Sequence, residues 1–496
     1  MSHKAHAHQA KPSSPVAKLL TGLIIMFTIV VIGRVAMPRP LPATAALSRS
    51  VDNVDASINN LWVLVCFVLI FMMQPGFAFL ESGLIRFTNV INVLFKNTIT
   101  TCISGVCFLA VGYSLMWNSG SGISDLRGSL DIGWLSPRPY ADGISPPVHF
   151  LFQIAFAMTA VTIISGAVAG RINLYAYLVI AVAMSAFIYS ISGYWAWNEH
   201  GWLKQLDFHD FAGSSVVHCV GGFAALAGAV LVGPRTALIN KGDPILLEDL
   251  SSKEFQAADI LNFNQSSNKP HSVGFATLGT FLLWMGWFGF NGGSELAMSG
   301  VNAEDGLCHL DRVGRIVMNT FIAGCSGGVF AMVGSGIYNL LTEKETKKDD
   351  EEDSKLQLDL EDVLNGILGG CVAITACCDL IVNPIAAVCV GGLAGLLVFT
   401  TVSLLYTYRT MLKIDDPVGA IAVHAMCGML GTLSCGFLGA KLHIQALGMI
   451  CIGGWSFIVS FTVFWILKRI GRLRASTVDE IRGLDRTYHG KSAYKF

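Results

Sequence analysis

Long apolar runs constrain the fold of this chain more than any other feature. Between Asn60 and Lys468 there are eleven runs of about twenty mostly apolar residues, the length at which an α-helix crosses the ~30 Å hydrocarbon core of a bilayer. Charged residues make up only 14% of the chain, against about 25% in soluble domains. The sequence therefore predicts an all-α polytopic membrane protein with spans at 61–82, 95–117, 149–170, 173–197, 212–233, 272–292, 316–341, 361–379, 383–406, 418–438 and 444–467.

A twelfth apolar run, residues 19–37, precedes these spans and is interrupted by Arg34. It has the features of a cleaved signal peptide, with small residues at 43–46 as the cleavage region. It also has those of a retained signal anchor, an extra transmembrane helix whose Arg34 reaches the interface. Both readings stay open. The expected domains are an N-terminal segment at 1–57, a transmembrane domain at 58–468 and a C-terminal tail at 469–496.

Basic residues in the connections predict the orientation of the chain. If the 61–82 span starts outside, the cytoplasmic segments carry 24 of the 33 Lys and Arg residues, including the run KRIGRLR at 468–474. The charged connections 236–271 and 342–360 then face the cytoplasm. We therefore expect an integral protein of the plasma or cytoplasmic membrane with a cytoplasmic C-terminus.

One motif occurs twice, as DFAGSSVVH at 210–218 and as DPVGAIAVH at 416–424. Each copy opens an apolar run, so each Asp is expected to cap a helix N-terminus, but on opposite faces of the membrane. At 1.5 Å per residue, the His eight residues later lies about 12 Å deeper. His218 and His424 are therefore predicted to reach similar depths near the midplane on oppositely directed helices.

The two histidines could be structural, each bonding a neighbouring carbonyl. Ionisable groups inside a membrane are costly, however, and usually mark a transport pathway. Among the twelve histidines of the chain, only His218 and His424 fall deep within expected spans. We therefore favour a pathway, whereas helix capping alone would account for Asp210 and Asp416.

The doubled motif also predicts the architecture. Five spans lie in 61–233 and five in 272–438, and an odd number of spans inverts the second set relative to the first. Two inverted repeats with a working site at the midplane are the plan of many transporters. The last span, 444–467, belongs to neither repeat.

Several longer motifs resemble one family. They are MQPGFAFLESGLIRFTNVINVLFKN at 73–97, DFAGSSVVH at 210–218, LLWMGWFGFNGGSELA at 282–297, DDPVGAIAVHAMCGMLGTL at 415–433 and GLDRTYHGKSAY at 483–494. In this order they resemble the ammonium transporter (Amt/Mep/Rh) family, and the Amt branch more than the Rhesus branch. The resemblance covers about residues 58–496.

The resemblance implies roles for single residues. Phe156 and Phe290 match the stacked phenylalanines that gate the outer pore. Trp197 matches the aromatic wall of the external ammonium site, which also involves Phe156. Ser294 matches the hydroxyl of that site and Asp210 the acidic residue beneath it.

His218 and His424 match the twin histidines of the pore and are expected to relay a proton. The resemblance further implies eleven spans and a homotrimer with one pore in each subunit. A cytoplasmic regulatory protein could dock on the tail.

The expected function is transport of ammonium through the bilayer. Ammonium and potassium have similar size and equal charge, but only ammonium can donate hydrogen bonds or lose a proton. A Trp face attracts the cation by about 0.5–2 kcal/mol, and loss of a proton would then exclude potassium. The alternatives are an ammonium receptor that signals through its cytoplasmic face, and a neutral-gas channel for ammonia or carbon dioxide. No enzyme, cofactor, metal or nucleic-acid motif is expected.

Overall fold

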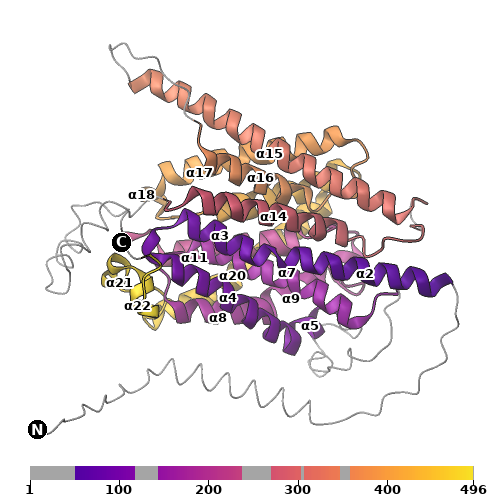
Figure 1. Cartoon of the computed structure of the whole chain (residues 1–496), viewed down its shortest axis with the longest axis horizontal. Helices are drawn as coiled ribbons and strands as arrows, with labels where there is room; N and C mark the ends of the chain where they lie inside the picture. Colours follow the sequence, from indigo (N-terminus) through magenta and orange to yellow (C-terminus); the bar gives the residue numbers. More distant parts are fainter. Residues whose placement is uncertain (1–50, 118–142, 237–269, 303–305, 347–357, 495–496) are drawn as a thin grey trace, which may run out of the picture. The chain divides into compact units, whose positions relative to one another are not determined.

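Helices make up most of the structure. The computed structural model describes residues 51–117, 143–236, 270–302, 306–346 and 358–494 (Figure 1). The expected segment 19–37 therefore lies outside the described residues. The helical elements are α2 (Val51–Phe71), α3 (Met73–Leu84), η1 (Phe87–Asn89), α4 (Val90–Cys107), η2 (Phe108–Gly112), α5 (Tyr113–Trp117), α7 (Pro146–Ala167), α8 (Leu174–Ala183), η5 (Met184–Ile188), α9 (Tyr189–Trp197), α10 (Trp202–Gln205), η6 (Ser214–Cys219), α11 (Val220–Val232), α14 (Val273–Gly293), α15 (His309–Thr346), α16 (Leu360–Ile374), α17 (Pro384–Thr407), α18 (Arg409–Leu412), η8 (Ile421–Met426), α19 (Cys427–Phe437), α20 (Leu442–Arg469), α21 (Thr477–Arg482) and α22 (Leu484–His489).

Polar side chains start several of these helices by binding free backbone N–H groups. The Asn173 side chain accepts from the backbone N–H of Tyr175 at the start of α8, and Asp359 accepts from that of Glu361 at the start of α16. Asn383 does the same for Ile385, and Pro384 occupies the first turn of α17, where no N–H partner is needed. Local sequence thus sets where these helices begin.

The prediction of an all-α membrane protein is confirmed. Among the described residues, nine helices are long and apolar enough to cross a bilayer. The eighth and tenth expected spans correspond to shorter helical segments, Leu360–Ile374 and Ile421–Phe437, so the count of eleven spans stays a prediction.

Three helices have bounds that differ from those of the expected spans. The first helix begins at Val51 rather than at 61, so it also crosses the expected domain boundary at 57/58. The seventh begins at His309 rather than at 316, because a helix can continue past the hydrocarbon edge on polar residues. The eighth ends at Ile374 rather than at 379, where the chain makes a short turn.

The two copies of the motif run in opposite directions. Asp415, before the second copy, pairs with Arg235, which follows the end of α11. Lys441, after the end of α19, pairs with Asp207, just before the first copy. The Arg235–Asp415 pair marks one end of the bundle, which we call the tail side (residues 171–173, 233–236, 415–416 and 473–485). The Lys441–Asp207 pair marks the opposite end, which we call the Asp210 side (residues 197, 207–211, 376–379 and 441).

Glycines let the two halves of the chain touch at the middle of the bundle. A Cβ added at Gly222, four residues after His218, would collide with the backbone of Ala425, which follows His424. A Cβ at Gly428, four residues after His424, would collide with the carbonyl of Ser214 in η6. Each copy of the motif is therefore followed by a glycine that packs against the backbone of the opposite half.

The tail packs back onto the tail side of the bundle. The Arg86 guanidinium donates to the carbonyls of Glu480 and Ile481 at 3.2 and 3.0 Å. The Asp485 carboxylate accepts from the backbone N–H of Asn92 at 2.8 Å, at the start of α4. Residues 50–496 form one compact unit, so tail and bundle are joined.

An arginine and aspartate cluster links the two halves beneath the tail. The Arg171 guanidinium donates to the carbonyls of Gly233 and Asp415, and that of Arg235 makes two hydrogen bonds to the Asp415 carboxylate. Burial alone would raise the pKa of Asp415, but Arg235 and Arg171 outweigh it and hold that pKa at about 2. The cluster therefore stays ionised at physiological pH.

Substitution of Gly222 tests the central contact. We expect Gly222→Ala to destabilise the protein by about 1–3 kcal/mol, because the added methyl meets backbone that cannot move aside. Gly454→Ala in α20 is the control, since nothing lies within 4 Å of a Cβ there and Ala favours the helix. Thermal melting in detergent checks this, and a melting temperature for Gly222→Ala at or above wild type would contradict it.

Docking of the tail should depend on pH through Asp485. Burial raises the pKa of the Asp485 carboxyl to about 6, although backbone N–H groups of α4 oppose the rise. Because this folded value lies above the unfolded value of about 3.9, the stability contributed is full below pH ~4 and lost as pH rises through about 6. Hydrogen-exchange protection factors of α22 should therefore fall severalfold from pH 5 to pH 7. Asp485→Asn, which cannot titrate, should abolish the step; an equal step in that variant would refute the assignment.

Candidate functional site

His218 and His424 meet at the centre of the bundle. Their Nδ1 atoms lie 3.1 Å apart, and their rings are nearly parallel, with centroids 5.2 Å apart. Both side chains are buried. Since a neutral imidazole has one donor and one acceptor, one shared proton satisfies both Nδ1 atoms. The Nε2 atom of His218 has no hydrogen-bond partner among the residues that the structure describes.

Each histidine lies on a π-helical turn. His218 belongs to η6 and His424 to η8, the segments that begin α11 and α19. A π-turn widens the helix by one residue and often occurs at functional sites, because it redirects one side chain. The sequence repeat predicted the paired depth of the histidines but not this change in helix geometry.

Aromatic rings form a continuous column from the histidines toward the Asp210 side. Phe290 lies 5.6 Å from His218, Phe156 lies 4.1 Å from Phe290, and Trp197 lies 6.0 Å from Phe156, all between ring centroids. Phe156 and Phe290 are 1% and 0% exposed, so this part of the column is closed. We call these five residues, Trp197, Phe156, Phe290, His218 and His424, the central column.

Asp210 holds two parts of the central column in place. Its carboxylate accepts four backbone N–H groups, from Gly213, Ser214, Ser215 and Val216, at 2.8–3.0 Å. Its carbonyl accepts from the Trp197 indole at 2.7 Å. One residue therefore fixes both the segment that carries His218 and the outermost ring of the column.

The second copy of the motif is built differently. Asp416 accepts a hydrogen bond from the backbone N–H of Ile421 at 2.7 Å, and its other oxygen is buried with no hydrogen-bond partner in the described part of the chain. Burial raises the pKa of Asp416, with partial opposition from the N–H groups of Ile421 and Ala420. The two aspartates thus share a position in the motif but not the same environment.

Ser294 ends α14, one turn beyond Phe290. Its hydroxyl donates to the Phe290 carbonyl at 2.9 Å, and the side chain is partly exposed. The lone pairs of the hydroxyl remain able to accept from an N–H donor. The structure therefore connects Ser294 to the central column through Phe290.

Some residues around the histidines were not singled out from the sequence. Trp287 stacks on His218 at 5.4 Å and donates its N–H to Thr375, and Phe77 lies 6.1 Å from His424. Aromatic residues are common in membrane helices, so no local signal distinguishes these two.

Glu81 and Lys96 are different, because both are ionisable residues within expected spans and both are buried. The position of these two charged residues within expected spans is visible in the sequence, but they were not singled out from it.

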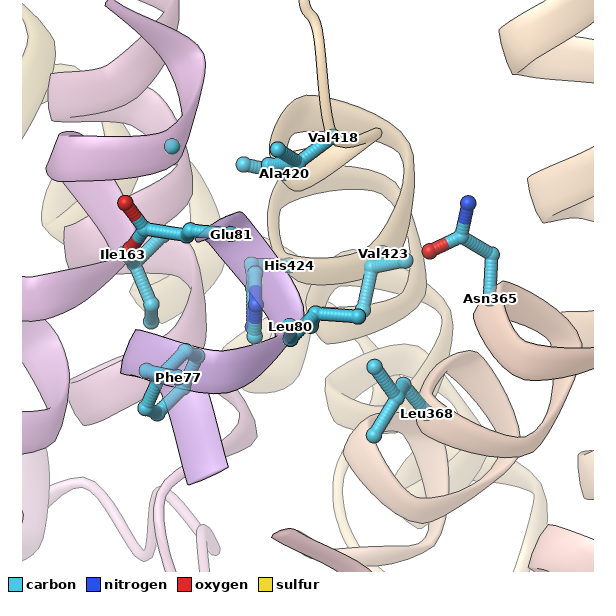
Figure 2. A pocket seen from close by; sticks show the side chains of 11 residues that line it. Phe77, Leu80, Glu81, Ile163, Asn365, Leu368, Val418, Ala420, Val423 and His424 are labelled. Carbon is cyan, nitrogen blue, oxygen red and sulfur yellow. The ribbon is translucent and has the colours of Figure 1, made fainter. Parts of the chain in front are cut away.

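A small cavity lies next to His424 (Figure 2). It is lined by His424 together with Glu81, Asn365 and apolar side chains. Val418 and Ala420, which precede His424 on the chain and come from the tail side, also line it. The cavity therefore lies between the histidine pair and the tail side.

The thirteen cysteines are all free, and among the described residues no cluster of His, Cys, Asp and Glu could hold a metal ion. The groups described above are the imidazoles, the aromatic rings, the carboxyl groups and the Ser294 hydroxyl. Together the fold and the site define a polytopic helical membrane protein with aromatic rings and paired imidazoles along its core.

Comparison with known proteins identifies the family. The model of the Ammonium Transporter Family matches residues 61–250 and 259–494. A relative from Synechocystis, itself assigned provisionally as an ammonium transporter, is 36% identical over 492 residues, covering 97% of this chain and 98% of the relative. The ammonium transporter Amt2 of Archaeoglobus fulgidus is 33% identical and covers 89% of each chain.

A solved structure, that of a Sensor Amt Protein, is similar with a TM-score of 0.69 and 34% identity, covering 88% of this chain and all of that one. The chain therefore belongs to the ammonium transporter family, and the resemblance seen in its motifs is confirmed.

Loss of the Asp210 carboxylate should weaken the fold more than loss of its counterpart. Asp210→Ala leaves four buried N–H groups without an acceptor, and we expect a cost of about 2 kcal/mol or more. Asp416→Ala removes the acceptor of Ile421 and should cost less, while Asp210→Asn keeps one acceptor oxygen and should be intermediate. Melting temperatures measured side by side check this order, and equal losses for the two Ala variants would contradict it.

Proposed function

We propose that this protein conducts ammonium across the membrane along the central column, with His218 and His424 as a proton relay. The observation that carries the proposal is the Nδ1–Nδ1 hydrogen bond of 3.1 Å at the inner end of a closed aromatic column. A buried, neutral and hydrogen-bonded pair suits an uncharged solute better than a cation.

The ion is recruited on the Asp210 side. The Trp197 face attracts the cation by about 0.5–2 kcal/mol, and the Ser294 hydroxyl accepts one of its N–H groups. Both Asp210 oxygens already accept backbone donors, so this carboxylate acts through its negative field and by holding Trp197. Potassium has no N–H group to donate to the Ser294 hydroxyl.

The ion loses its proton at the gate formed by Phe156 and Phe290. Moving a bare charge into a low-dielectric medium costs on the order of tens of kcal/mol, far more than a cation–π contact supplies. Ammonia crosses at much lower cost and can hydrogen-bond to the imidazoles. His218 can accept the proton at its unpartnered Nε2 and pass on the shared proton from Nδ1 to His424.

The proposal includes sidedness and assembly. The Asp210 side faces outward and the tail side faces the cytoplasm of the plasma or cytoplasmic membrane, as the distribution of basic residues indicates. The protein acts as a homotrimer and not as an enzyme, and a cytoplasmic regulatory protein could bind the tail, α21 and α22.

A receptor is the second candidate. The Sensor Amt Protein shares 34% identity with this chain over its whole length, so the fold is compatible with sensing. Within the described tail, α21 and α22 are short helices that pack on the bundle, and a receptor could signal through them.

Currents in proteoliposomes test the proposal. Wild type should give a saturable ammonium current and none with potassium, because only ammonium can shed its charge at the gate. The His218→Ala, His424→Ala double variant should lose this selectivity and pass potassium, while His443→Ala, at an exposed position of α20, should behave as wild type. Internal alkalinisation without current would instead indicate a gas channel, and neither signal would favour the receptor.

A further inference from the structure

The cavity below His424 brings a buried carboxyl group close to the histidine pair. Glu81 on α3, Asn365 on α16 and His424 on η8 reach it from three different helices (Figure 2). Its volume is about 20 Å³, room for one water molecule. A single water can therefore connect the imidazole and the carboxyl group.

Glu81 belongs to a polar cluster buried among the membrane helices. The Ser165 hydroxyl donates to Glu81 Oε2 at 2.6 Å, and the Ser165 carbonyl accepts from Lys96 Nζ at 3.2 Å. Lys96 also lies 5.1 Å over the ring of Tyr177, and both charged residues are at most 2% exposed. Ser165 on α7 thus contacts Glu81 through its hydroxyl and Lys96 through its carbonyl.

A purely structural role does not explain this placement well. Two buried charges are costly, and replacing such a pair by apolar residues is often neutral or stabilising. A pair that served packing alone would not need its carboxyl group on the wall of a cavity shared with His424. Lys96 and Ser165 face the carboxyl group from α4 and α7, and both stabilise its charged form.

We infer that Glu81 is the proton carrier on the tail side of the histidine pair, and that it returns the proton to ammonia. This inference rests on the proposed function. The proton lost by ammonium passes through His218 and His424 to the cavity water and then to the Glu81 carboxylate, which becomes a neutral carboxyl group. When ammonia enters the cavity, that O–H transfers its proton to the ammonia nitrogen, giving ammonium and the carboxylate. The carboxylate is then again stabilised by the Ser165 hydroxyl and by the positive charge of Lys96.

The experiment uses the full-length protein in proteoliposomes, recording ammonium-evoked current and internal alkalinisation in parallel. The variants are Glu81→Gln and the double variant Glu81→Gln, Lys96→Met, which leaves no unpaired buried ammonium group. Glu199→Gln, which neutralises an exposed glutamate, is the matched control. Loss of a positioned proton carrier should lower the current by about tenfold or more, while ammonia still enters and alkalinises the interior.

The results for the double variant and for wild type test the role of Glu81 separately from the proposed function. A current in the double variant close to wild type, with wild type active, would overturn the role of Glu81 and leave the proposed function standing. Absence of both current and alkalinisation in wild type would overturn both. Loss of both signals in a stably folded double variant would make Glu81 a part of the pore and not a proton carrier.

Glu81→Asp settles the case if the Gln variants do not fold. It keeps the charge and the fold but withdraws the carboxyl group from the cavity by about one bond length, ~1.5 Å. We expect a current reduced severalfold with alkalinisation unchanged. An unchanged current in this variant would overturn the inference.

Discussion

The structure depends on one close crossing of backbones at the middle of the bundle. Gly222 and Gly428 have no side chain, so the backbone of the opposite repeat packs directly against each of them. This close packing lets the two Nδ1 atoms lie at hydrogen-bonding distance. Larger side chains would separate the helices and with them the imidazoles. The π-turns η6 and η8 then direct both histidines toward each other. The central column is therefore a consequence of how two inverted halves meet.

Electrostatics explains where the charged groups lie around this column. The Asp210 carboxylate is balanced by four backbone N–H groups at the head of η6, and Asp415 by two arginines on the tail side. Between these ends the column consists of aromatic rings and the two hydrogen-bonded imidazoles. Glu81 and Lys96 are both buried, and Glu81 shares the wall of a cavity with His424, the last residue of the column.

Much of this could be predicted from the sequence, because hydropathy and a repeated motif report directly on membrane helices. The helical membrane fold and the family are confirmed, and the structure brings His218, His424, Phe156, Phe290 and Trp197 together as one column. Helix starts at Val51 and His309 precede the expected spans, since hydropathy reports the hydrocarbon core and helices continue past its edge, whereas α16 ends at Ile374 because the chain turns there. The cavity and the Ser165 bridge could not be predicted, because their residues come from helices far apart in sequence.

The sequence by itself determined that the chain spans a membrane, that two halves repeat with opposite direction, and that each half carries an aspartate and a histidine eight residues apart. These features follow from residue type and spacing along one helix. Only the tertiary structure decided that the Nδ1 atoms of the two histidines lie at hydrogen-bonding distance, that Asp210 also holds Trp197, and that Glu81 shares a cavity with His424. Such contacts depend on how separate helices pack, and packing is a property of all the helices together and of no single segment.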